Sequence, residues 1–151
     1  MRHTHAEWAP GQDDHARALS ARGQDEAHRL GSWLKKSGHV PGHALVSDAK
    51  RTRQSFAALA LTCGADEMAD LYLAECTFLR AAIHATSQSD SLLLLAHNPG
   101  IAEVASTLVK TPPDHPAFYT YPPGATLVLD YDPQGGAAQL VDFTTPADLN
   151  P

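Results

Sequence analysis

Two arginines and two histidines in this sequence could bind a phosphate and accept it. Arg2 and His3 open the chain, Arg51 lies in its first half, and His97 follows a run of four leucines. An arginine guanidinium matches two phosphate oxygens with a planar fork and stays charged at any working pH. A neutral imidazole, with an ordinary pKa of roughly 6.5, is a nucleophile near pH 7 without a partner base. The combination predicts phosphoryl transfer to one histidine, while the second donates a hydrogen bond to the phosphate oxygens.

These side chains can act together only if the fold brings them to one place. Apolar residues at 44–46 and 91–96 predict two short buried strands, and Arg51 and His97 each follow one of them. In an open α/β sheet the ligand crevice lies beyond the carboxyl ends of the strands. Arg51 and His97 are therefore expected at the same rim. Ser47 and Ser20 are expected to serve as turn or cap residues rather than in chemistry.

The remaining pattern alternates helix with strand and ends in a hairpin. Apolar residues at helical spacing predict helices over 21–36 and 49–62, around 79–83, and over 101–108, with Pro99 in the first turn of the last. Further strands are predicted at 71–73, weakly, and at 126–131 and 138–143, with a turn at 132–136. This order predicts an α/β fold: a three-layer sandwich with a mostly parallel central sheet, helices on both faces and an antiparallel edge hairpin.

Composition narrows the class of protein. The chain has 151 residues, of which 43% are hydrophobic and 19% charged, as expected for a single domain over 1–151 with its own core. A net charge of −6 argues against nucleic acid or an anionic membrane as partner. No apolar run approaches the ~18 residues of a membrane helix, so we expect a soluble cytoplasmic protein. Cys63 and Cys76 lack CxxC spacing and are expected to be ordinary thiols in or near the core.

Four short motifs, each weak alone, stand in a recognisable order. They are Arg2-His3 followed by Glu7-Trp8; Asp14-x-x-Arg17-x-Leu19-Ser20-x-Arg22-Gly23; Ser47-x-Ala49-x-Arg51-x-x-Gln54-Ser55; and Ala96-His97-Asn98-Pro99-Gly100. In this order the sequence resembles the histidine phosphatase superfamily, and within it the small SixA-type phosphohistidine phosphatases. The resemblance runs from Met1 to about Tyr131, with residues 122–127 similar to a late strand of the family. It implies a phosphoglycerate mutase-like fold and a hydrolase that needs no metal or other cofactor.

The resemblance also implies roles for individual residues. It makes His3 the phosphorylated nucleophile and completes the phosphate pocket with Arg2, Arg51 and His97. Arg17 and Asn98 are candidate contacts at the rim of the pocket. Arg53, two positions past Arg51 on the same helix, is expected to point away from it as a surface charge.

The start of the chain departs from the family pattern. In the family an apolar strand precedes the Arg-His pair and lies in the middle of the sheet, whereas here only Met1 precedes it. A missing central strand would leave its two neighbours with unpaired edges and remove apolar cover from the core. We expect the natural reading frame to begin upstream of Met1. The alternative is that another segment occupies the slot.

A second departure from the family pattern concerns the acid that protonates the leaving group. Larger relatives that act on phosphate esters use a carboxylic acid to protonate the leaving alkoxide, and the nearest candidate is Glu75. SixA-type proteins are less dependent on such an acid, because the P–N bond is labile and imidazole is readily protonated by solvent. We therefore expect phosphohistidine on a signalling or carrier protein as substrate, recognised by surface loops such as 111–123. The alternatives are a small phosphate ester as substrate, or a non-catalytic module that binds phosphorylated ligands; oligomeric state stays open.

Metal binding is the weaker interpretation of the first histidines. His3-x-His5 could form half of a metal site, yet Ala6-Glu7-Trp8 follows in place of further ligands. We therefore expect no metal. The other histidines stand outside the motifs and are expected on the surface or in packing, and residues 11–14 are expected to form a solvated loop.

Overall fold

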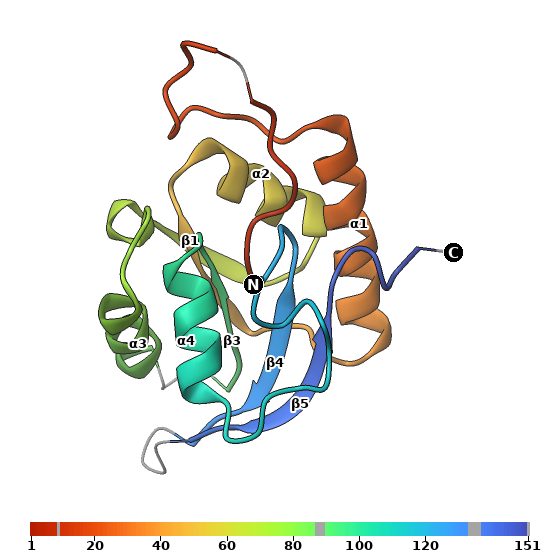
Figure 1. Cartoon of the computed structure of the whole chain (residues 1–151), viewed down its shortest axis with the longest axis vertical. Coiled ribbons are helices and arrows are strands. Elements are labelled where there is room, and N and C mark those ends of the chain that lie inside the picture. The colour runs from red at the N-terminus through yellow and green to blue at the C-terminus, as the bar shows by residue number, and fades with distance from the viewer. Residues whose placement is uncertain (9, 87–89, 133–136, 151) are drawn as a thin grey trace.

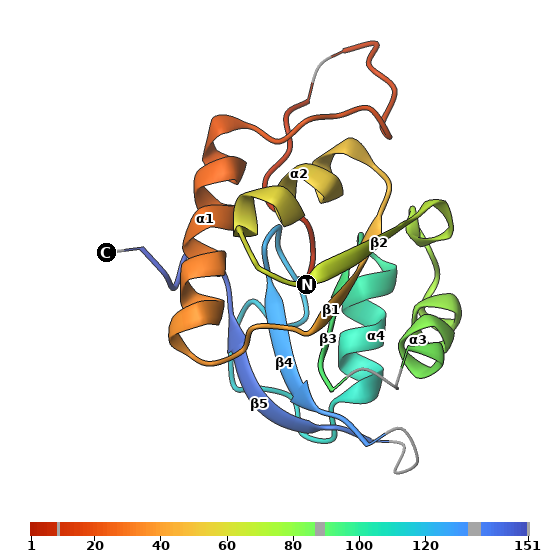
Figure 2. The ribbon, with the colours of Figure 1, turned by 180° about the vertical axis from the view of Figure 1, so that it is seen from behind.

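A central sheet with helices on both faces organises the chain (Figures 1 and 2). The structure is a computed structural model, and it describes all residues except 9, 87–89, 133–136 and 151. Strand β1 (His43–Ser47) is flanked in parallel by β2 (Gly64–Met68) and β3 (Leu92–Leu95). Strands β4 (Thr126–Asp130) and β5 (Gln139–Thr144) form a separate antiparallel pair.

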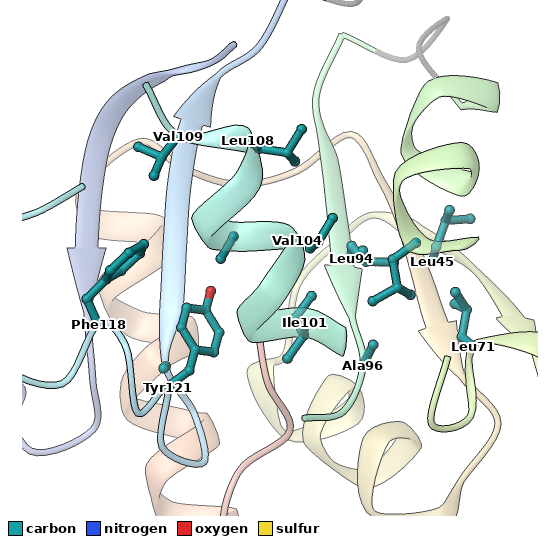
Figure 3. Close-up of a cluster of buried hydrophobic side chains, with 13 residues drawn as sticks. Leu45, Leu71, Leu94, Ala96, Ile101, Val104, Leu108, Val109, Phe118 and Tyr121 are labelled. Carbon is teal, nitrogen blue, oxygen red and sulfur yellow. The ribbon is translucent and has the colours of Figure 1, made fainter. Parts of the chain in front are cut away.

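The helices cover the two faces of the sheet in pairs. Helix α1 (Ala21–Lys36) packs on α2 (Lys50–Leu59), and α3 (Cys76–Ala85) packs on α4 (Gly100–Leu108). Successive side chains of a strand point to opposite faces, and both faces are apolar here. Leu45 and Leu94 enter the cluster beside α4 that Figure 3 shows, whereas Val46 and Leu95 enter the cluster beside α1. The predicted three-layer α/β architecture is confirmed.

Two boundaries show how local chemistry sets the helices. Ser20 caps α1 by accepting a hydrogen bond from the Gly23 N–H, as expected, and the helix covers the predicted residues. Helix α2 ends before the predicted residue 62, because Ala60 adopts a left-handed conformation with φ of 50°. Pro99 stands immediately before α4 as its cap residue.

The predicted strand at 71–73 is wrong. The chain there forms a short 3₁₀ helix, η1 (Ala69–Leu71), which anchors itself through the fully buried Leu71. The third parallel strand is β2 instead, whose residues are almost all exposed at the edge of the sheet. An exposed edge strand carries no apolar alternation, so its sequence gave no strand signal. The hairpin strands β4 and β5 are confirmed, while residues 133–136 of the predicted turn lie outside the described residues.

The first residues of the chain lie between the two sheets. Arg2 forms a parallel bridge to Ala96, just past β3, and its N–H donates to the carbonyl of Ala125, just before β4. The Met1 amine donates to the Leu94 carbonyl at 2.9 Å, and burial lowers its pKa to about 5. Residues 1–4 therefore fill one end of the central position in which the family strand was expected (Figure 1).

The rest of the space between β3 and β4, on the side of Met1 away from Arg2, is open. A groove of about 640 Å³ runs between β3 and β4 and reaches the helices of both layers. It is lined mainly by apolar side chains, among them Leu92, Leu94, Leu127, Leu129 and Val104. Within the described part of the chain no strand pairs with the edges of β3 and β4 along this groove. The two facing edges are therefore unpaired over most of their length.

The structure can also be compared with the expectations for the cysteines and for membrane helices. Cys63 and Cys76 are free thiols, half-buried against the two apolar clusters, as expected. No helix among the described residues has the length and apolar character needed to cross a membrane.

Candidate active site

A pocket of about 330 Å³ lies beyond the carboxyl ends of β1 and β3. It is lined by the following residues: Arg2, His3, His5, Ala6, Asp14, Arg17, Arg51, Leu73, His97, Asn98 and Pro123. The structure thus brings together every site residue named from the sequence except Glu75. Three of the lining residues are arginines, so the pocket concentrates positive charge in a chain whose net charge is −6.

His3 presents one ring nitrogen to this pocket. Its Nδ1 lies 2.8 Å from the Thr4 carbonyl and donates to it, while Nε2 accepts from Nε of Arg51 at 3.2 Å. These contacts define a neutral ring whose Nε2 carries the lone pair. Burial, together with the charges of Arg51 and Arg2, lowers the pKa of His3 to about 4 despite the hydrogen bond to Thr4. The ring of His3 is therefore neutral at pH 7, with its proton on Nδ1.

A buried network ties the first residues to helix α2. The N–H of Thr4 donates to Oγ of Ser55 at 3.1 Å, and that hydroxyl donates to the Arg51 carbonyl at 2.8 Å. Thr4 and Ser55 are both fully buried, so this network has little freedom. It fixes the backbone beside His3 relative to Arg51.

His97 is oriented by a residue whose role the sequence did not reveal. Its Nε2 lies 2.8 Å from Oγ of Ser47, and Oγ also accepts from the N–H of Ala49 at 3.4 Å. Nε2 of His97 is the one acceptor within hydrogen-bond distance of the Ser47 hydroxyl among the described residues, and in the tautomer that accepts this bond the ring proton of His97 lies on Nδ1. Burial is the main reason that the pKa of His97 falls to about 3, with His3 and Arg51 adding to it. Ser47 was expected only as a turn residue, because the contact depends on the pairing of β1 with β3.

Two buried N–H groups in the pocket have no partner among the described residues. They are Nδ1 of His97 and Nε of Arg2. Nη1 of Arg2 donates to the Tyr121 carbonyl at 2.9 Å, which also accepts from Nδ2 of Asn98 at 3.2 Å. Buried polar groups without partners are rare in folded proteins. These two nitrogens and Arg51 are the groups that the pocket offers to a tetrahedral oxyanion beside Nε2 of His3.

Asp14 is a pocket residue that the sequence analysis placed in a solvated loop. Its Oδ2 accepts from Tyr72 Oη at 2.6 Å and from Nη2 of Arg51 at 2.9 Å, and Oδ1 accepts from Nη1 of Arg17 at 2.9 Å. The Tyr72 hydroxyl and Arg17, followed by Arg51, hold the pKa of this carboxyl far below its usual range. The signal was the Asp14-x-x-Arg17 spacing, but an aspartate in a polar loop is more typical of a turn.

Glu75, the candidate acid, lies outside the pocket. It precedes α3 as its exposed cap residue, and Leu73 lines the pocket instead. Leu73 has a left-handed φ of 51°, which turns the chain between the buried Leu71 and α3. Of the other residues considered, Arg53 is exposed and faces Glu67 at 3.8 Å, and Nδ1 of His5 hydrogen-bonds to Oγ of Ser20 at 2.8 Å.

In this layered α/β fold, two histidines and three arginines line one pocket, as in proteins that bind phosphate. The sequence assigns the family. A profile of the histidine phosphatase superfamily (branch 1) matches residues 1–82, which is more than half of the chain. The chain belongs to the histidine phosphatase superfamily. Two uncharacterized proteins of Mycobacterium tuberculosis, Rv1276c and MT1313, are each 28% identical to it over 157 residues, covering 97% of this chain and 99% of theirs.

Solved structures agree with this assignment. A protein from Nakamurella multipartitia assigned as the phosphohistidine phosphatase SixA is 26% identical, with a TM-score of 0.82, and the match covers 97% of this chain and 93% of that one. A second such protein, from Agrobacterium tumefaciens, is 25% identical with a TM-score of 0.83, covering 97% and 95%. A protein histidine phosphatase SixA in complex with tungstate has the same fold at 23% identity and a TM-score of 0.83, covering 99% and 97%.

Proposed function

We propose that the protein removes phosphate from phosphohistidine on another protein, through a phosphorylated His3. The observation that carries the proposal is the placement of Nε2 of His3, unprotonated at neutral pH, beside Arg51 and the two open donors of Arg2 and His97. A nucleophile and donors preset around one phosphate position are what phosphoryl transfer needs from a protein. The proposal assigns every step to an ordinary side chain of this pocket.

The proposed reaction has two halves. In the first, the lone pair of His3 Nε2 forms a bond to phosphorus while the bond from phosphorus to the substrate nitrogen breaks. The Nδ1–H of His3 continues to donate to the Thr4 carbonyl, which stabilises the charge that develops on the ring. Arg51, Arg2 and His97 hold the phosphoryl oxygens as the group moves. In the second half, the oxygen of a water molecule bonds to phosphorus while the bond from phosphorus to Nε2 breaks; the electron pair returns to His3, and the protons of the water leave with inorganic phosphate.

The absence of an acid favours a nitrogen-linked phosphate over an ester. Asp14 is the one carboxyl group that lines the pocket among the described residues, and its lowered pKa keeps it ionised. An ester leaves as an alkoxide and needs a proton in the transition state, whereas a phosphohistidine ring that is already protonated on its other nitrogen leaves as neutral imidazole. The ester alternative requires Glu75 as the acid. We expect Glu75→Gln to leave turnover of both phosphohistidine and a small ester unchanged; a large loss of ester turnover would favour the alternative.

Exposed side chains at the pocket rim support a protein substrate. Trp8 is 76% exposed with the Arg17 guanidinium 4.7 Å above its ring, and Leu73 is 50% exposed at the edge of the pocket. Pro123 brings the end of the 111–123 loop to the same rim. Aromatic and arginine side chains of this kind are common in protein interfaces. Phosphohistidine carriers of the cytoplasm are the proposed partners.

Trapping the intermediate tests the proposal. The protein is mixed with a phosphohistidine peptide labelled with ³²P, quenched, and analysed for an acid-labile, base-stable adduct. We expect the label on His3, no label in His3→Ala, and full activity in EDTA. Active wild-type protein without an adduct on His3 would refute the mechanism. Binding of the peptide without turnover, unchanged in His3→Ala, would instead identify a binding module.

A further inference from the structure

The Asp14 carboxylate sits at a place where negative charge is costly for a phosphatase. It lines the pocket that holds His3, and it is bound directly to Arg51 through Nη2 at 2.9 Å. A second anion beside a bound phosphate dianion repels it and competes for the same guanidinium. A carboxylate in this position therefore raises the question of what interaction offsets the repulsion.

Two simple functions do not fit the contacts. Proton donation to a leaving group is excluded, because three hydrogen-bond donors hold the carboxyl in its ionised form. Fixing Arg51 does not need the whole group, because only Oδ2 and the backbone carbonyl of Asp14 contact that guanidinium. Oδ1 accepts only from Arg17 among the described residues, so it has capacity for another donor. The side chain is 42% exposed, so a ligand can reach it.

We propose that Asp14 is a specificity-determining residue: it accepts a hydrogen bond from a positively charged leaving group and so selects phosphate bound to nitrogen over phosphate esters. The inference rests on the proposed function and adds a residue that recognises the leaving group. Phosphohistidine meets the requirement, because its ring can carry a proton on the nitrogen that is not bonded to phosphorus. That N–H is the donor for Oδ1 of Asp14.

The charge balance of the step explains the preference. The substrate enters with its ring protonated as an imidazolium that carries the ionised phosphoryl group, and a nearby carboxylate raises the fraction of rings in that form. When His3 Nε2 bonds to phosphorus, the electron pair of the breaking P–N bond passes to the substrate ring. The ring leaves as neutral imidazole and keeps its proton, so no acid is consumed. An ester oxygen instead gains negative charge near Asp14, which raises the barrier for ester hydrolysis.

The substitution Asp14→Asn separates this role from a structural one. We would measure kcat/KM for a phosphohistidine peptide and for p-nitrophenyl phosphate, an ester whose leaving group needs no acid. Loss of a charge-assisted hydrogen bond predicts a fall of about 10- to 100-fold with the peptide. The ester loses no such bond and is no longer repelled by Asp14, so the ratio of the peptide value to the ester value is expected to fall about 10- to 100-fold. This fall in the ratio, rather than either value alone, is the result that the inference predicts.

Controls make each outcome decisive. Glu75→Gln makes the same change of charge outside the pocket and is expected to leave the ratio of the two kcat/KM values unaltered. Asp14→Glu keeps the charge, is expected to restore much of the ratio, and serves also if Asp14→Asn does not fold. Equal losses with both substrates would show that Asp14 acts only by holding Arg51, which overturns the inference. Failure of the wild type to hydrolyse the peptide would refute the proposed function instead.

Discussion

Joining a short apolar strand to Met1 is expected to stabilise the protein by filling the groove between β3 and β4. Residues 1–4 already pair with both neighbours, in parallel with Ala96 and through a hydrogen bond with Ala125. Continuing that register, about four added residues would lie opposite 91–94 on one side and 127–130 on the other. Apolar side chains are required on both faces, because the groove opens to the helices of both layers.

The magnitude follows from burial, ordering and one charge. Burying four Val, Ile or Leu side chains contributes about 6–12 kcal/mol, and ordering four backbone residues costs about 4–8 kcal/mol. The free energy gained from new hydrogen bonds between strands is similar in size to the side-chain entropy that the added residues lose, so these two contributions cancel. Burial lowers the pKa of the Met1 amine to about 5, so folding pays for its deprotonation at pH 7. Converting the amine into an amide removes this cost and stabilises the protein by a further ~1.4 kcal/mol. The sum is about 4 kcal/mol, or roughly 10 °C in Tm.

Thermal unfolding of three proteins measures this effect: the unextended chain, the chain with four apolar residues added, and the chain with a Gly-Ser extension of equal length. The polar extension is expected to provide only the amide contribution, which is a few degrees. A proline inside the apolar extension removes a ladder donor and is expected to cancel most of the gain. Equal Tm values for the apolar and polar extensions, with rapid amide exchange in the added residues, would refute the strand-binding interpretation of the groove.

Two further predictions concern the pocket. Ser47→Ala removes the hydroxyl that orients His97, so we expect kcat to fall about 10- to 100-fold with little change in KM; no additional loss should occur in a His97→Ala background, and an additive loss would contradict the contact. His3 and His97 have pKa values of about 4 and 3, below the unfolded value of about 6.5, so the unfolded chain binds more protons and the free energy of unfolding falls as the pH drops below that value. Between pH 6.5 and 5 each histidine should lower the free energy of unfolding by about 1.6 kcal/mol, and a pH dependence of Tm as steep in His97→Ala as in the parent protein would contradict this.

The parts of the fold that could be predicted are those buried on both sides. The apolar runs of β1 and β3 lie between two helical layers, so burial makes them plain in the sequence. Parallel strands end at one rim, which is why the sequence alone predicts that Arg51 and His97 lie together. The polar edge strand β2 could not be found, because its exposed side chains carry no apolar period.

The missed pocket residues depend on contacts between distant segments. Asp14 and Tyr72 are 58 positions apart and meet only when the loop before α1 lies over the end of β1. Ser47 and His97 meet only through the pairing of β1 with β3. Such contacts cannot be predicted from residue type and spacing, because they form only when distant segments pack together. The sequence therefore identifies the charged and nucleophilic groups of the pocket more readily than the neighbours that orient them.

The groove and the pocket are connected through residues 1–4. His3 lies in this segment, which is held by the main chain of Ala96 on one side and of Gly124 and Ala125 on the other. Its hold on α2 passes through Thr4 and Ser55, and the amine of Met1 is buried at the mouth of the open groove. A proposed nucleophile needs a fixed position relative to its phosphate donors, because small displacements lower the rate strongly. A strand placed in the groove would therefore act on the backbone that positions His3, and pairing of the free edges of β3 and β4 would stabilise the pocket as well as the sheet.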